Sequence, residues 1–171
     1  MTLGRLYETL QRIADIACGE VAPEPHVTLA YYYNVTAVQL APLGDAVADL
    51  ALQAAPLVMQ ARRLIRDPGF SPAYDPYALF FEIDKTPPMA VVYAWLRRLG
   101  TQQGLEVSPA GAQAWVPHFK VVSAPAPVAE ATKDQIDRLA MAVHFTTTHL
   151  VLSFRGDTDD WKNVGAYPLA D

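Results

Sequence analysis

Two histidines of this sequence stand in matching surroundings. His26 lies in residues 25–29 (PHVTL) and His118 lies in residues 117–121 (PHFKV), so each follows a proline and precedes an apolar and then a polar residue. Histidine is the side chain best suited to moving protons near neutral pH, and two imidazoles facing one cleft can act as base and acid on opposite sides of a phosphorus. The repeated pattern therefore predicts a paired acid and base that needs no metal.

The polar residue two places after each histidine lies on the same face of an extended strand as the histidine. In the first segment it is Thr28, whose hydroxyl can donate a hydrogen bond to a phosphate oxygen, and in the second it is Lys120, whose ammonium can do so with a full charge. Such donors stabilise the negative charge that develops during displacement at phosphorus. An inward-facing lysine on a central strand is costly without an anion, so we expect a phosphate or a carboxylate near Lys120.

Each of these residues also has an ordinary structural interpretation. Either histidine alone is typical of a strand near the surface, and Thr28 suits a strand by its β propensity, but the repeated context favours function for the histidine pair. Tyr32 shares the predicted strand face of His26 and can stack on a nucleobase, whereas Tyr31 and Tyr33 are predicted to pack in the core.

Three further residues are weaker candidates. Arg155, which follows a predicted strand on the face of Ser153, can add positive charge at the mouth of a cleft, although an arginine there is also typical of a solvated position. Trp115 and Trp161 can offer platforms for a base, but tryptophan is more often a core or rim residue. We therefore expect Arg155 as a candidate binding residue and the tryptophans as structural ones.

Hydrophobic periodicity predicts a chain of helices and strands. We expect helices at residues 3–17, 39–54, 86 to 100 or 104, and about 132–143, and strands at residues 26–35, 57–65, 77–83, 115–123, 147–154 and about 164–169. Twice a helix is followed by a loop and then by a Pro-His strand, which indicates an internal duplication. In this interpretation the strand at 77–83 opens the second copy and has no counterpart in the first.

Composition limits the class of protein. The 171 residues, 51% of them apolar, fit one domain with a substantial core. Cys18 is the only cysteine, and no secretory leader or membrane-length apolar run is present, so we expect a cytoplasmic protein without an intrachain disulfide. A net charge of −5 and a pI near 5.3 argue against long double-stranded nucleic acid and allow a small anionic ligand in a local basic pocket. No zinc spacing, phosphate-binding glycine loop or Ser-His-Asp signature is found, so no metal or cofactor is expected, while the oligomeric state stays open.

Residues 26–29 and 118–121 resemble the two His-x-Thr motifs of the two-histidine (2H) phosphoesterases, the LigT-like superfamily. The resemblance spans roughly Leu3 to Leu169 in the order and type of elements. It implies an α+β, bilobal fold for residues 1–171 as a single domain with two pseudo-symmetric lobes, in which two antiparallel-rich sheets face a central cleft and the helices lie outside.

The resemblance also implies an activity. Family members cleave 2′,3′-cyclic phosphates, 2′,5′-linked oligonucleotides or, in some bacteriophages, cyclic nucleotides used as immune signals. For this chain it implies a metal-independent phosphodiesterase in which one of His26 and His118 activates water or a ribose 2′-hydroxyl and the other protonates the leaving oxygen.

The second motif departs from the family pattern. Lys120 stands where threonine or serine is usual, which implies altered phosphate contacts, a shifted histidine pKa or a lost activity. The alternative is therefore a binding module that captures a small nucleotide or oligonucleotide with His26, Thr28, Lys120 and an aromatic ring but does not cleave it.

Overall fold

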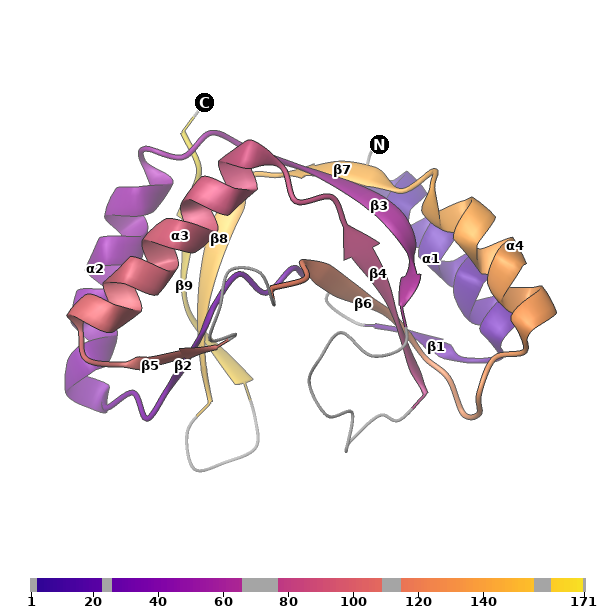
Figure 1. Cartoon of the computed structure of the whole chain (residues 1–171), viewed down its shortest axis with the longest axis horizontal. Helices are drawn as coiled ribbons and strands as arrows, with labels where there is room; N and C mark the ends of the chain where they lie inside the picture. Colours follow the sequence, from indigo (N-terminus) through magenta and orange to yellow (C-terminus); the bar gives the residue numbers. More distant parts are fainter. Residues whose placement is uncertain (1–2, 23–25, 66–76, 109–114, 156–160, 171) are drawn as a thin grey trace. The chain divides into compact units, whose positions relative to one another are not determined.

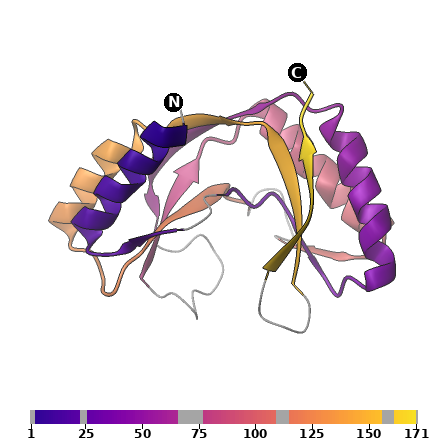
Figure 2. The same ribbon diagram turned by 180° about the vertical axis from the view of Figure 1, so that it is seen from behind.

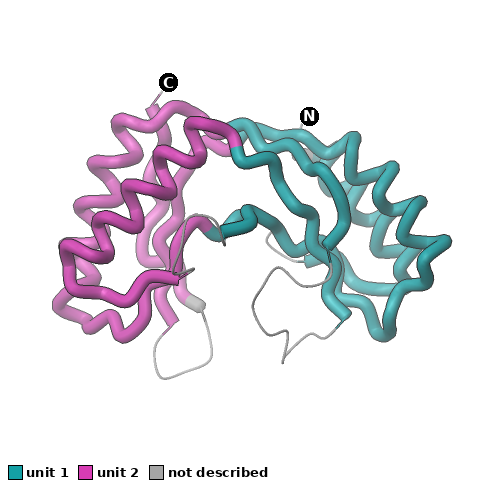
Figure 3. Tube along the Cα trace, viewed as in Figure 1, with its two compact units in different colours: residues 1–28, 58–85, 115–146 teal, residues 29–57, 86–114, 147–171 magenta. Residues whose placement is uncertain are grey.

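The computed structural model describes residues 3–22, 26–65, 77–108, 115–155 and 161–170. They form an α+β fold, as predicted, and they divide into two compact units (Figure 3). Unit 1 comprises Met1–Thr28, Val58–Lys85 and Trp115–Thr146, and unit 2 comprises Leu29–Leu57, Thr86–Ala114 and Thr147–Asp171. None of the helices in the described residues combines the length and apolar character that crossing a bilayer requires.

Unit 1 is a five-stranded sheet with two helices packed on one face (Figure 1). Its strand order is β1-β6-β4-β3-β7, and the pairs β1–β6, β6–β4 and β4–β3 are antiparallel. Helices α1 and α4 lie side by side in both views (Figures 1 and 2). The elements are α1 (Leu3–Ala17), β1 (Glu20–Val21), β3 (Leu57–Ile65), β4 (Ala78–Ile83), β6 (His118–Ser123), α4 (Glu130–Ala140) and β7 (His144–Thr147).

The core of unit 1 lies between the sheet and these helices. Apolar residues at helical spacing on α1 are buried: Leu6, Leu10, Ile13 and Ala17. On the sheet, Phe81 and Phe119 are opposite one another in β4 and β6, and their rings meet edge to face at 5.5 Å. Five of the six residues of β4 are buried, as expected for a strand with neighbours on both sides.

Unit 2 contains two two-stranded sheets and two helices. Strand β2 pairs with β5, and β8 and β9 form an antiparallel hairpin. Helices α2 and α3 pack on one another, and α2 also contacts the hairpin (Figures 1 and 2). The elements are β2 (Tyr31–Tyr33), α2 (Ala37–Ala51), α3 (Pro87–Gln102), β5 (Glu106–Ser108), β8 (His149–Arg155) and β9 (Trp161–Pro168).

The order of elements repeats, but not in the register predicted from sequence. The chain runs α1-β1-β2-α2-β3-β4 and then α3-β5-β6-α4-β8-β9, with β7 directly before β8. Strand β4 therefore closes the first copy and does not open the second, and its counterpart is β9 at the end of the second copy. The prediction that the first copy lacks a strand was wrong, because the strand at 77–83 was assigned to the wrong copy.

The two copies exchange strands. Strand β1 of the first copy pairs with β6 of the second, and β5 of the second pairs with β2 of the first. Each compact unit consequently contains elements from both copies, which local sequence patterns do not reveal. That the units are pseudo-symmetric lobes of one domain stays a prediction.

Candidate active site

His118 is the first residue of β6, a strand held between β1 and β4. Its alternating neighbours Phe119 and Val121 are fully buried, while His118 and Lys120 are half-buried. Because successive strand residues lie on opposite faces, the apolar pair anchors the strand to the core and directs His118 and Lys120 to the face away from it. The alternation predicted for these four residues is confirmed.

The imidazole of His118 has a defined orientation. Its Nδ1 lies 2.7 Å from the carbonyl oxygen of Val116, and because a carbonyl only accepts, Nδ1 carries the hydrogen and donates it. In the neutral ring Nε2 is then the nitrogen with the lone pair. The rings of Phe80 and His118 are nearly perpendicular, with an angle of 83° between their planes and 5.5 Å between their centroids. The hydrogen bond to Val116 and the contact with Phe80 thus help to fix the orientation of the ring.

The surroundings of His118 favour its neutral form. Burial lowers the pKa of the imidazole below its ordinary value of 6.5, the hydrogen bond to Val116 opposes this, and repulsion from a charge on His26 lowers the pKa further. The third cause is informative about geometry, because it requires the two histidines to be near enough to interact electrostatically. Both belong to unit 1.

His26 lies in a different backbone setting from the one predicted. It is exposed, and residues 26–30 form no strand, so the strand predicted at 26–35 is limited to Tyr31–Tyr33. The place beside β6 is taken by Glu20–Val21, which the sequence analysis missed. High β propensity in residues 26–30 does not suffice, since the chain here passes from one unit into the other and a strand requires a paired neighbour.

Thr28 is held near the second motif through its backbone. The indole Nε1 of Trp115 donates to the carbonyl oxygen of Thr28 at 3.5 Å, and the ammonium of Lys85 lies 5.3 Å from the centre of the Trp115 ring. Trp115 is only 4% exposed, which confirms its predicted structural role. The segment that carries His26 is therefore tied to the residues just before His118.

Three charged residues near His118 were not among the predicted site residues. Glu82 is directly opposite His118 in the β4–β6 ladder, and Arg63 is opposite Glu82 in the β3–β4 ladder. The carboxylate of Glu82 accepts from the Nε of Arg63 at 2.6 Å and lies 3.8 Å from a guanidinium nitrogen of Arg62. The position of Glu82 at the end of the apolar run at 77–83 could have marked it as a candidate from sequence. Its alignment with His118 could not have been predicted, because it depends on the register between β4 and β6.

The environment of Lys120 fits the expectation of a nearby anion only in part. Its cross-strand neighbour is Phe80, not a carboxylate. Glu82 lies one rung further along β4 on the same face, within the diagonal reach of a long side chain. Lys120 is half-buried, and its contact with phosphate stays a prediction.

Tyr32 and Arg155 belong to unit 2. The Tyr32 hydroxyl donates to the carbonyl oxygen of Leu96 at 2.7 Å, burial raises its pKa, and its ring fills space that a β-carbon at Gly100 would need. These contacts give Tyr32 a packing role against α3. Arg155 is the exposed last residue of β8, paired in register with Trp161. Roles for Tyr32 and Arg155 in binding stay predictions.

The three tyrosines alternate as predicted, but the prediction that Tyr31 and Tyr33 form the core face was wrong. Tyr31 and Tyr33 are exposed, at 36% and 47%, whereas Tyr32 is the more buried of the three. Strand β2 was expected to continue the face of His26, but it starts only at Tyr31, in another unit. Its burial pattern is therefore set by α3 and β5, against which it packs.

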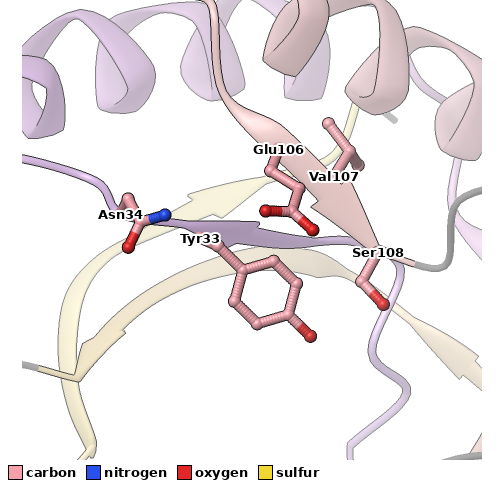
Figure 4. Close-up of a pocket in the computed structure, with 5 residues that line it drawn as sticks. All are labelled: Tyr33, Asn34, Glu106, Val107 and Ser108. Carbon is pink, nitrogen blue, oxygen red and sulfur yellow. The ribbon is translucent and has the colours of Figure 1, made fainter.

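An open depression lies within unit 2. It has a volume of about 290 Å³ and is lined by Tyr33, Asn34, Glu106, Val107 and Ser108, from β2 and β5 (Figure 4). The carboxylate of Glu106 lies beside the ring of Tyr33 (Figure 4). The described residues that line the depression thus include an acidic side chain, whose negative charge disfavours a phosphate there.

Neither a metal centre nor a family match decides the function. Among the described residues, no group of three or more His, Cys, Asp or Glu side chains could hold a metal ion. No family model matches the sequence. A search of curated proteins finds no match either.

The fold does match solved structures. It is similar to the crystal structure of TT0787 of Thermus thermophilus, with a TM-score of 0.60 and 15% sequence identity over 97% of this chain and 90% of that one. At this level of identity the likeness shows a common fold. What the site does must be argued from its residues.

Proposed function

We propose that this protein is a metal-independent phosphodiesterase that cleaves a small nucleotide phosphodiester with His26 and His118 as acid and base. The observation that carries the proposal is the electrostatic interaction of these two histidines in one compact unit, where a charge on His26 lowers the pKa of His118. Two imidazoles close enough for the charge of one to act on the other are suited to opposite proton transfers at one substrate. The resemblance of both motifs to the two-histidine phosphoesterases points to the same chemistry.

The asymmetry of the pair supports one assignment of the two roles. His118 is kept neutral by burial, and its Nδ1–H is engaged by Val116, so its Nε2 is suited to remove a proton from water or from a ribose 2′-hydroxyl. His26 is exposed, and in its protonated form it delivers a proton to the leaving oxygen. The base ends the step with one proton more and the acid with one fewer, and exchange with solvent restores both.

Thr28 and Lys120 supply the contacts to phosphate in this proposal. A hydroxyl and an ammonium that donate to the non-bridging oxygens stabilise the charge that accumulates there in the transition state. Lys120 adds a full positive charge where the family has a hydroxyl. We expect it to compensate for the excess of acidic residues, since the chain carries a net charge of −5.

The same net charge favours a small substrate over a long nucleic acid, because a long backbone would be repelled along most of its contact. The substrate class is therefore a 2′,3′-cyclic phosphate, a 2′,5′-linked oligonucleotide or a cyclic oligonucleotide. In the last case the protein would be a phage-type anti-defence enzyme that removes a bacterial immune signal.

Purified protein incubated with EDTA and a panel of 2′,3′-cyclic nucleotides, 2′,5′-linked dinucleotides and cyclic di- and trinucleotides tests the proposal, with products resolved by chromatography. We expect cleavage of at least one class, abolished in His26→Ala and in His118→Ala but retained in His144→Ala, an exposed histidine of β7. Tight binding without products would favour the nucleotide-binding module, and neither binding nor cleavage would refute both.

A further inference from the structure

A row of three polar side chains crosses the sheet of unit 1 at His118. Arg63 of β3 pairs in register with Glu82 of β4, and Glu82 pairs with His118 of β6. Directly opposed residues of neighbouring strands share a face, and adjacent strands lie about 4.8 Å apart. Glu82 therefore stands between a guanidinium on one side and the imidazole on the other, and its carboxylate can approach either.

A bulge in β3 increases the positive charge on the Arg63 side of this row. The register shifts between Ala61 and Arg63, so that β3 advances by two residues where β4 advances by one. Both Arg62 and Arg63 consequently reach the carboxylate of Glu82, whereas in a regular strand consecutive residues would lie on opposite faces. Arg62 also contacts Asp84, with its Nε at 3.0 Å.

Arg63 makes the shorter contact with Glu82. Its Nε lies 2.6 Å from the carboxylate, against 3.8 Å for Arg62. The side chain of Glu82 is 16% exposed, while those of Arg62 and Arg63 are 60% and 69% exposed. A carboxylate this far from water requires a partner, and among the described residues its ion pairs are with these two arginines.

We propose that Arg63 is a positioning residue that holds the Glu82 carboxylate on the β3 side of its strand and so keeps it away from the ring of His118. The inference rests on the proposed function, in which His118 is the base. A carboxylate turned toward the imidazole would stabilise the imidazolium and occupy Nε2, the nitrogen that must accept the substrate proton.

Among the described residues, the other charged groups around His118 do not provide a second carboxylate beside its ring. A charge on His26 opposes protonation of His118, and Lys120, two residues further along β6, is a cation and not a carboxylate. Glu20 of β1 is opposite Ser123, at the far end of β6 from His118. Helix α1 packs against β6 on the apolar side of the strand. On β4, Glu82 is the acidic residue directly across from His118.

The experiment is an NMR titration of the His118 ring protons, assigned with His118→Asn, in wild type, Arg63→Ala, Glu82→Gln and the double variant. We expect Arg63→Ala to raise the pKa of His118 by about one unit, because the freed carboxylate turns to the imidazole. The same substitution in the Glu82→Gln background should leave the pKa nearly unchanged, and Arg63→Lys should restore most of the wild-type behaviour.

The Glu82→Gln background separates positioning from a direct effect of charge. An equal rise in both backgrounds, or no rise in a folded Arg63→Ala protein, would overturn the proposal. Arg62→Ala is the matched control, with a smaller expected rise because Arg62 is the more distant of the two partners. The titration contains no substrate, so its result does not depend on phosphodiesterase activity. A failure of the proposed function in the cleavage assay can therefore be told apart from a failure of this proposal.

Discussion

The two histidine segments have nearly the same local sequence and different structures. His118 begins a strand with a neighbour on each side, is half-buried, and has one ring nitrogen bound to a backbone carbonyl. His26 is exposed, and the residues that follow it up to residue 30 form no strand. Both segments still reach one compact unit, where a charge on the first acts on the second.

The comparison indicates that a repeated local sequence does not by itself give a repeated structure. Whether the segment pairs with neighbouring strands decides how deeply its apolar residues are buried. The side chains of Phe119 and Val121 in β6 are buried in the core and anchor the strand there. Val27 and Leu29, at the equivalent positions, are only half-buried. A half-buried, oriented base beside an exposed acid would suit the proposed division of roles, because the base has to stay neutral and the acid has to regain its proton from solvent.

The largest expected effect comes from His118→Asn. The amide nitrogen of asparagine can occupy the position of Nδ1 and keep the hydrogen bond to Val116, while the nitrogen proposed as the base is lost. We expect kcat/KM to fall about 10²- to 10⁴-fold with the fold retained, as is typical when a general base is removed. Steady-state kinetics on the cleaved substrate and a circular dichroism spectrum check this.

His144→Asn is the matched control for this change. It removes an exposed histidine from strand β7 of the same sheet and should leave kcat/KM within about twofold. If both variants lost activity equally, the distinction between His118 and other histidines of unit 1 would fail.

The next effect compares the same substitution in the two segments. Val121→Ala removes methyl groups from a fully buried site in β6 and should lower the free energy of unfolding by about 2–3 kcal/mol. Val27→Ala removes the same groups from a half-buried site and should lower it by about 1 kcal/mol. Urea denaturation measures both, and equal losses would show that the first segment is held as firmly as the second.

The sequence was sufficient to predict elements whose apolar residues follow a regular helical or strand period. The helix at 3–17 and the strand at 57–65 have the predicted bounds, because each has a regular apolar stripe. The faces of residues 118–121 in β6 were predicted correctly for the same reason, but Val122, predicted on the face of His118, is fully buried beyond a shift in the β4–β6 register. Both histidines were chosen because their context repeats.

The remaining features depend on contacts between distant residues. The place of β1 beside β6, the exchange of strands between the copies and the assignment of β4 to the first copy are pairing choices that no local pattern specifies. The alignment of Arg63 with Glu82 depends on the bulge in β3, and that of Glu82 with His118 depends on the pairing of β4 with β6, and no local pattern specifies either. The candidate site was thus found from its histidines, while its carboxylate and guanidinium groups were missed.

A smaller effect is expected from the residue that distinguishes the two motifs. Lys120→Thr gives the second segment the His-x-Thr pattern of the first and removes a charge proposed to hold phosphate, so KM should rise about tenfold, with a smaller fall in kcat from the lost transition-state contact. Thr28→Val is the counterpart in the first segment, since it removes one hydroxyl at nearly constant shape. Kinetics of Lys120→Thr indistinguishable from wild type would remove Lys120 from the site.

The smallest expected effect is on the pH dependence of stability. Burial lowers the pKa of folded His118 below 6.5, its value in the unfolded chain, so a proton binds the unfolded chain more tightly. The stability contributed by His118 is fully present above pH 6.5 and is lost as the pH falls from 6.5 toward the lower pKa of the folded state. Wild type should therefore lose more free energy of unfolding than His118→Asn between about pH 7.5 and about pH 5.

His26→Asn extends this measurement to the other segment. The substitution removes the charge that helps to lower the pKa of His118 but leaves the burial, which is the larger cause. The loss of stability between the same two pH values should then be intermediate between wild type and His118→Asn in urea denaturation. A loss at or above that of wild type would contradict the electrostatic interaction of the two histidines, on which the assignment of acid and base depends.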